Sequence, residues 1–197
     1  MAYPDLIPLM MFMFAAAFTP GPNNILASYS GFNFGLIKTI PHMFGVIFGF
    51  TTLVVVMNIG LINVFKNFLI VQEILKYAGT IFLIYLAYKI SFSKTRSDNS
   101  SKSPVKFIET FFFQFLNPKA VIVAIIIVST YVESGENYIN YSLWVIAIAF
   151  IFACFSIVFW TLLGRFLRRF ATNEKFIKRF NYVMSLLLVS CIATFYL

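Results

Sequence analysis

The sequence predicts an all-α integral membrane protein in which six transmembrane helices form two inverted repeats of three helices each. Of its 197 residues, 60% are hydrophobic and 11% are charged. Soluble domains are about half apolar and about a quarter charged, so the composition favours a membrane protein. The apolar residues gather in six runs, each close to the roughly 20 residues that a helix needs to cross a bilayer. Three runs precede a polar segment at 93–106 and three follow it.

The six runs follow one another through mostly short connections. The first begins soon after Asp5, with no Lys or Arg before it. Signal peptides carry a positively charged start, so we expect a retained span rather than a cleaved leader. Lys66 and Asn67 interrupt the apolar stretch between the second and third runs and predict a tight turn there. The six spans are predicted at residues 6–30, 40–64, 69–90, 107–131, 140–163 and 177–197.

The polar segment 93–106, SKTRSDNSSKSPVK, is the one clear linker in the sequence. It is rich in serine and ends close to Pro104, a composition typical of loops. It separates a first repeat at 1–92 from a second repeat at 107–197, both within one transmembrane domain. Because each repeat has an odd number of spans, the second enters the membrane in the opposite sense to the first. This is the layout of inverted-repeat transporters.

The basic residues are expected to mark the cytoplasmic side of the membrane. Lys and Arg concentrate in the cytoplasmic loops of membrane proteins, and twelve of the 15 in this chain follow spans one, three and five. Both termini are therefore expected outside the cell. The basic loops are expected to face anionic lipids, with no nucleic-acid partner. The twelve residues are Lys38, Lys89, Lys94, Arg96, Lys102, Lys106, Arg165, Arg168, Arg169, Lys175, Lys178 and Arg179.

Two of the spans contain helix breakers deep inside an apolar run. The string FTPGPNNIL places Pro20 and Pro22 in span one, and FLNPKA places Asn117 and Pro118 in span four. Proline lacks a backbone donor and is tolerated at the first helical position, so each break is predicted to start a new half-helix, with Asn117 as an N-cap. At 1.5 Å per residue, both breaks lie roughly 12 to 15 Å from the cytoplasmic surface, near the midplane. For either proline alone, a simple kink is the alternative explanation.

These breaks predict a binding site at the midplane. Backbone groups freed by a break must line a cavity or pack inside protein, and two converging helix N-termini favour an anion such as a carboxylate. Lys119 is the only basic residue in mid-span. We expect it to pair with a substrate carboxylate or to accept a proton, and a structural lysine that bonds freed carbonyls remains an alternative. The predicted substrate-binding residues are Gly21, Pro22, Asn23, Asn24, Gln114, Asn117, Pro118 and Lys119.

The spans offer no residues for enzyme chemistry or metal binding. No His-Asp, His-Glu or Cys-Cys set occurs in mid-span, and no Asp or Glu lies there, so we predict neither an enzyme nor a metal or cofactor site. Cys154 and Cys191 lie inside apolar runs and are expected to be packing residues rather than redox or metal ligands. His42, the only histidine, is expected at the cytoplasmic boundary of span two. A role in sensing pH is the alternative.

These motifs resemble the LysE/RhtB family of bacterial amino-acid exporters. The resemblance is carried by TPGPNN in span one, LKYAGTIFLIYLAYKI in span three and FLNPKA in span four. It implies that the family's signature positions are Pro20, Gly21, Pro22, Asn23, Asn117, Pro118 and Lys119. Spaced glycines accompany the motifs and are expected to let helices pack closely: Gly31, Gly35, Gly45 and Gly49. The last span departs from the family pattern, because Ser185, Ser190 and Cys191 stand where family members usually carry glycines.

The resemblance implies a secondary transporter that exports an amino acid or derivative across the bacterial cytoplasmic membrane. Alternating access driven by the proton motive force, or by another coupling ion, is expected, without a cofactor. Homodimer formation is left open. A divalent-cation or heavy-metal exporter of the same superfamily is the first alternative, and the absence of mid-span carboxylates in the sequence disfavours it. A non-transporting membrane scaffold is the second, although a scaffold has little reason to bury Lys119.

Overall fold

The computed structural model describes residues 4–92, 105–133, 135–193 and 195–196, and within these residues it is helical with no strand. The all-α prediction is therefore confirmed for the described residues. Most of the predicted linker 93–106 lies outside them. The elements are α1 (Leu6–Phe18), α2 (Pro22–Val56), the π-helix η1 (Met57–Leu61), α3 (Ile62–Asn67), α4 (Leu69–Ser91), α5 (Phe107–Leu116), α6 (Pro118–Tyr131), α7 (Tyr138–Leu167), the 3-10 helix η2 (Arg168–Phe170) and α8 (Glu174–Ala193).

Several of these helices are long and apolar enough to cross a membrane. Within the described residues there are 4 such segments, or 5 if α5 and α6, bent by 63° at their break, count as one span. The helix α1 is apolar but has only 13 residues, too few to cross a bilayer alone. The four segments are Pro22–Leu61, Glu73–Ser91, Tyr138–Phe170 and Glu174–Ala193. The chain is thus a multi-pass membrane protein.

The two predicted helix breaks are confirmed. The helix α1 ends at Phe18 and α2 begins at Pro22, while α5 ends at Leu116 and α6 begins at Pro118. Both prolines lie at the start of their helix, where a backbone N–H would have no partner within the helix, so its absence costs no hydrogen bond. The side chain of Asn117 accepts a hydrogen bond from the backbone N–H of Lys119 at 3.2 Å, as an N-cap does.

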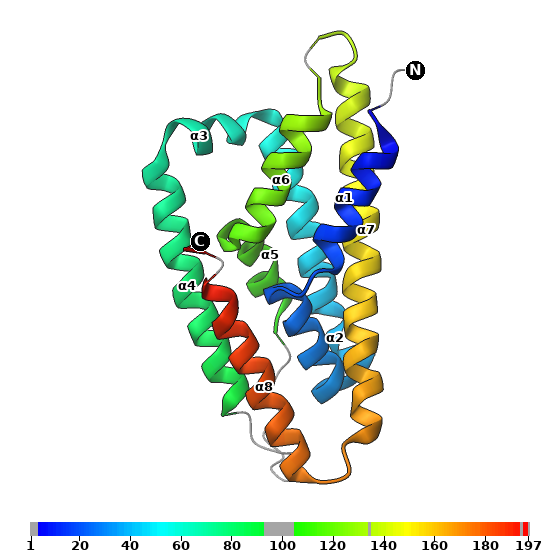
Figure 1. Ribbon diagram of the computed structural model, residues 1–197, viewed down its shortest axis with the longest axis vertical. Helices are drawn as coiled ribbons and strands as arrows, with labels where there is room; N and C mark the ends of the chain where they lie inside the picture. The colour runs from blue at the N-terminus through cyan, green and yellow to red at the C-terminus, as the bar shows by residue number, and fades with distance from the viewer. Residues whose placement is uncertain (1–3, 93–104, 134, 194, 197) are drawn as a thin grey trace.

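The helix α2 turns back on itself at Gly35. This residue has φ 77° and ψ 176°, a backbone conformation that residues other than glycine rarely adopt. In Figure 1 the first part of α2 runs down to the lower end of the molecule and the second part runs up again. The predicted packing role of Gly35 is wrong, because a Cβ added there would meet no atom within 4 Å. The residue makes a turn rather than a helix contact.

The connection between the second and third predicted spans is also different from the expected tight turn. Gly60, inside η1, has φ 135° and changes the direction of the chain. The short helix α3 follows and lies across the upper end of the molecule in Figure 1. Phe68, with φ −123° and ψ 81°, then separates α3 from α4. The turn therefore begins earlier than Lys66, and a short helix bridges the two spans.

Close backbone contacts hold α2 against α7 and α5. A Cβ on Gly31 would lie 2.1 Å from the carbonyl oxygen of Thr161, and one on Gly164 would lie 2.0 Å from that of Ser28. On the second part of α2, a Cβ on Gly45 would lie 2.5 Å from the carbonyl oxygen of Phe107. The fourth predicted glycine, Gly49, is equally tight, with its added Cβ 2.6 Å from the carbonyl oxygen of Phe111 and 2.8 Å from Cγ of Gln114. The glycines let these helix backbones touch.

A second layer is formed by α4 and α8, which pack against each other in Figure 1. Ser185 on α8 accepts a hydrogen bond from Ser91 Oγ at 2.7 Å and donates one to the carbonyl oxygen of Ala87 at 2.9 Å. Ser185, at a position where the family resemblance predicts glycine, is small enough to keep α8 close to α4. The lower end of the molecule holds the Gly35 turn, the end of α4, the start of α5 and the α7–α8 connection.

Candidate functional site

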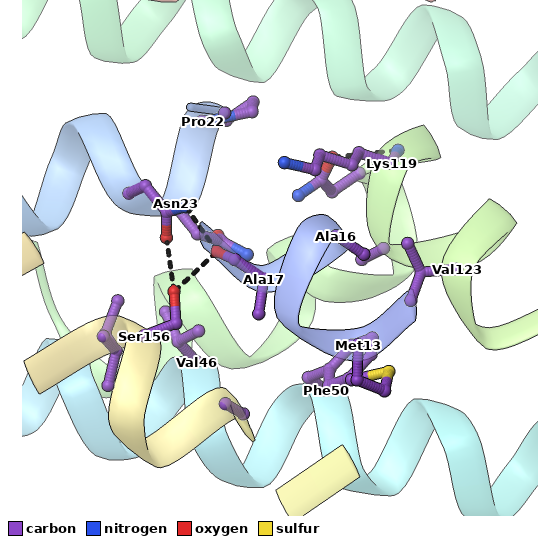
Figure 2. A pocket seen from close by; sticks show the side chains of 16 residues that line it. Met13, Ala16, Ala17, Pro22, Asn23, Val46, Phe50, Lys119, Val123 and Ser156 are labelled. Atoms are coloured by element: carbon purple, nitrogen blue, oxygen red, sulfur yellow. Dashed lines mark hydrogen bonds between the residues drawn. The ribbon is translucent and has the colours of Figure 1, made fainter. Parts of the chain in front are cut away.

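The two helix breaks meet at one cavity. Its volume is ≈ 80 Å³, and its walls come from α1, both parts of α2, α6 and α7. Figure 2 shows Lys119 on one side of the cavity, Ser156 and Val46 on the other, and Met13 and Phe50 at one end. Six of the eight predicted substrate-binding residues line it: Gly21, Pro22, Asn23, Asn24, Asn117 and Lys119.

The start of α2 faces this cavity without a side-chain cap. Gly21 is its N-cap residue, and glycine has no side chain that could accept from the first backbone N–H groups. The lysine side chain crosses directly over this residue, since a Cβ on Gly21 would lie 3.1 Å from Cδ and 3.2 Å from Nζ of Lys119. The glycine therefore leaves both the helix N-terminus and the lysine open to the cavity.

In this structure Lys119 is held by a freed carbonyl. Its ammonium donates a hydrogen bond of 2.7 Å to the carbonyl oxygen of Thr19, in the segment between α1 and α2. This contact joins the two halves of the chain across the cavity. The contact is the one expected if Lys119 is a structural lysine that bonds a freed carbonyl. The pairing of Lys119 with a substrate carboxylate stays a prediction.

The carbonyls at the end of α1 are satisfied by two neighbouring side chains. Asn24 Nδ2 donates to the carbonyl oxygens of Ala17 and Thr19, at 2.8 and 2.9 Å. Ser156 Oγ donates to the carbonyl oxygen of Ala17 at 2.6 Å and lies 3.4 Å from Oδ1 of Asn24 (Figure 2). Asn24 therefore lines the cavity while its amide donors hold the broken backbone.

Asn23 and Gln114 form an amide pair across the two halves. Asn23 Nδ2 donates to Gln114 Oε1 at 2.8 Å, and Gln114 Nε2 donates to Asn23 Oδ1 at 3.1 Å. Gln114 also donates to the carbonyl oxygen of Thr110 at 2.8 Å and is fully buried. Gln114 does not line the cavity, so it positions Asn23 rather than facing the cavity itself.

The start of α6 faces the same cavity. Asn117 is 2% exposed and caps this helix, and Pro118 opens it without lining the cavity. Two positive helix ends, those of α2 and α6, therefore converge with the lysine ammonium, while the carbonyl end of α1 supplies partial negative charge. No Asp, Glu, His or Cys is among the residues that line the cavity, and in the described part of the chain no group of three or more such residues could hold a metal ion.

The contribution of α7 to the cavity is not evident in the sequence. The hydroxyls of Ser142 and Thr161 on this helix donate hydrogen bonds to the backbone carbonyls four residues earlier, as hydroxyl side chains in helices commonly do. Ser156 instead reaches the carbonyl of Ala17 on α1. Nothing in the spacing of these hydroxyl residues distinguishes the three, so only the packing of α7 against α1 reveals the role of Ser156.

Comparisons with known proteins identify the family of the chain. The family described as LysE type translocator matches residues 14–196. Cysteine/O-acetylserine efflux proteins of Escherichia coli (strain K12), Shigella sonnei (strain Ss046) and Shigella flexneri are 31% identical over 181 residues, which is 89% of this chain and 89% of each relative. No solved structure matches the chain. The chain belongs to the LysE type translocator family, and it is a membrane transport protein rather than an enzyme.

Proposed function

We propose that this protein exports a small amino acid of the cysteine and O-acetylserine class across the bacterial cytoplasmic membrane by alternating access. The observation that carries the proposal is the cavity at the two helix breaks, where Lys119 and the N-termini of α2 and α6 face the carbonyl end of α1. An amino acid carries one negative and one positive group a short distance apart. The cavity offers partners for both.

The substrate carboxylate is proposed to bind at the open N-terminus of α2 and the ammonium of Lys119. Helix N-termini attract anions through unpaired N–H groups and the helix dipole. The substrate ammonium would then take the place of the lysine at the carbonyl oxygen of Thr19. Lys119 would leave this carbonyl and bind the carboxylate. The lysine ammonium therefore has a hydrogen-bond partner both in the empty site and in the filled site.

The walls of the cavity favour a small side chain. Ala16, Ala120 and Ala153 line it together with Met13 and Phe50, and the volume is ≈ 80 Å³. Pockets of this kind select by excluded volume and a few polar contacts. The relatives are described as cysteine/O-acetylserine efflux proteins, and neither compound has a side chain as long as that of lysine. Ser156 is the one hydroxyl among the lining residues and is proposed to contact the polar part of such a side chain.

The transport cycle is proposed to use six spans in two inverted repeats, separated by the linker. In this arrangement α1 and the first part of α2 form one broken span, and α5 and α6 form its counterpart in the second repeat. Rocking of the repeats around a shared midplane site would expose it to each side in turn, driven by the proton gradient. The basic lower end of the molecule is proposed to face the cytoplasm and its anionic lipids, with both termini outside.

The function is tested with everted membrane vesicles, in which export appears as uptake. Vesicles containing the protein are expected to accumulate labelled cysteine or O-acetylserine several-fold above empty-vector vesicles when energised, and a protonophore should abolish the difference. Lysine and phenylalanine serve as competitors, because their side chains are longer than the acetylated side chain of O-acetylserine. Accumulation at the empty-vector level for every amino acid tried would refute the proposal, and strong competition by phenylalanine would refute the proposed size limit.

A further inference from the structure

His42 is a buried imidazole beside the cavity that the proposed binding scheme does not use. It lies in the second part of α2, close to the Gly35 turn, with 0% of its surface exposed. Among the described residues, neither Nδ1 nor Nε2 has a hydrogen-bond partner. The backbone of Asn23, whose side chain lines the cavity, lies close enough to interact with the ring, although the contact does not meet the distance and angle of a hydrogen bond.

An imidazole in this position requires an explanation. Buried polar groups are nearly always hydrogen bonded, and an imidazole carries one N–H donor when neutral and two when protonated. A ring that has no partner in one conformation is best accounted for by a second conformation in which it has one. Imidazole is also the side chain that changes charge between about pH 5 and 8, the range in which a cell maintains a proton gradient.

His42 is connected to the cavity through α5. Thr110 Oγ1 lies 3.3 Å from the backbone carbonyl oxygen of His42 and shares its proton with the carbonyls of Phe107 and Lys106, at 3.1 and 3.2 Å. The carbonyl of Thr110 accepts from Gln114 at 2.8 Å. Gln114 in turn holds Asn23 at the cavity wall. The contact between α2 and α5 is tight here, since a Cβ on Gly45 would lie 2.5 Å from the carbonyl oxygen of Phe107. Separation of this contact would let water reach an imidazolium.

We propose that His42 is a proton-binding site whose protonation is coupled to substrate binding in the cavity. This inference rests on the proposed export function. A proton adds to the lone pair of a ring nitrogen and no bond is broken. The charged ring favours a form in which α2 and α5 separate and water reaches it, while the neutral ring favours the closed form described here. Gln114, which holds Asn23 at the cavity wall, also packs against Gly49 on the second part of α2. Proton binding and substrate binding therefore change each other's affinity by the same factor.

The charged groups of the surrounding helices leave the ring without a counter-ion. Glu109, one residue before Thr110 on α5, pairs with Lys89 at 3.5 Å and accepts from the backbone N–H of Lys106 at 2.8 Å. Lys119 lies at the cavity and bonds to Thr19. Three basic residues on these helices are exposed: Lys38, Lys106 and Arg165. Among the described residues no fixed carboxylate thus stabilises a proton on His42 in the closed form, which makes proton binding sensitive to conformation.

The chain offers a direct spectroscopic test, because His42 is its only histidine. Protein labelled with 15N-histidine, purified through a tag without histidine and placed in nanodiscs, gives a single imidazole signal to titrate. With saturating O-acetylserine the titration midpoint is expected to move by about half a pH unit or more, a roughly three-fold change in proton affinity. An unchanged midpoint, in protein that exchanges O-acetylserine in the same preparation, would overturn the inference. Protein that fails to exchange it refutes the proposed function instead.

Transport variants give a second test in proteoliposomes. His42→Gln cannot gain a proton, so its flux is expected to lose the response to an imposed pH gradient by about five-fold or more, while counterflow, which needs no net proton movement, continues. Ser30→Ala is the matched control, since Ser30 is also fully buried on α2 and without a partner among the described residues but does not titrate. A full gradient response in His42→Gln, or an equal loss in Ser30→Ala, would overturn the inference. If His42→Gln loses counterflow as well, the titration of the wild-type ring decides.

Discussion

Asn23 and Gln114 lie 91 residues apart in the chain and exchange two amide hydrogen bonds, of 2.8 and 3.1 Å. The first residue belongs to the half-helix that follows the break in the first half of the chain, and the second to the half-helix that precedes the break in the other half. Their pairing joins the two halves at the cavity. It fixes the orientation of Asn23, so the polar wall of the cavity depends on a side chain outside it.

The amide pair predicts a measurable energetic coupling. Asn23→Ala and Gln114→Ala are each expected to lower the free energy of unfolding by about 1–3 kcal/mol, because the remaining amide loses its buried partner. The double variant should lose less than the sum of the two, by about 0.5–3 kcal/mol. Unfolding in detergent micelles measures this cycle. Strictly additive losses would mean that the two amides do not stabilise each other.

The cap at Asn117 predicts that stability and transport can be separated. Asn117→Asp keeps an oxygen that accepts from the backbone N–H of Lys119 and is expected to preserve the melting temperature, whereas Asn117→Ala should cost about 0.5–2 kcal/mol. The aspartate also places a negative charge close to Lys119, the proposed partner of the substrate carboxylate. We therefore expect Asn117→Asp to fold normally and to transport poorly. Transport by Asn117→Asp at the wild-type rate would contradict the proposed carboxylate position.

Both helix breaks could be predicted from the sequence because their cause is local. Proline cannot sit inside a regular helix without losing a hydrogen bond, so Pro22 and Pro118 had to begin helices wherever the rest of the chain went. The capping role of Asn117 follows from the same short-range chemistry. Local rules of this kind located six of the eight predicted residues at the cavity.

Other features depend on tertiary contacts that the sequence does not state. Gly35 follows Gly31 at helical spacing and was expected to pack, but only Gly31 meets another helix backbone, and Gly35 makes a turn. Ser156 is one of several hydroxyl residues on α7, and only the approach of α1 distinguishes it. The burial of His42 likewise results from how α2 folds back at Gly35, which the predicted loop between spans one and two did not specify.

The contact between α2 and α7 predicts that Gly164 tolerates no larger residue. A Cβ there would lie 2.0 Å from the carbonyl oxygen of Ser28, so Gly164→Ala is expected to force the helices apart and lower the melting temperature by several degrees. Ala147→Val adds more volume on the exposed face of the same helix and should leave the melting temperature nearly unchanged. Equal stability of both variants would contradict the close backbone contact.

The size of the cavity predicts that filling it blocks transport without unfolding the protein. Ala153 lines the cavity of ≈ 80 Å³, and Ala153→Leu is expected to occupy most of the space that the substrate needs. The melting temperature should change little, because the added atoms enter empty volume. Ala147→Leu on the exposed face of α7 is the control and should transport normally. Normal export of O-acetylserine by Ala153→Leu would place the substrate elsewhere.

The most direct test of the proposed site is counterflow of labelled O-acetylserine by purified protein in proteoliposomes, comparing Lys119→Met with Lys76→Met. Methionine keeps a long aliphatic side chain and removes the charge in both variants. Lys76 lies over the ring of Tyr196, at 4.1 Å, and does not line the cavity. The wild type and Lys76→Met are expected to exchange the substrate, and Lys119→Met to fall by about ten-fold or more while remaining folded. Exchange by Lys119→Met at the wild-type rate would contradict the assignment of this cavity as the substrate site.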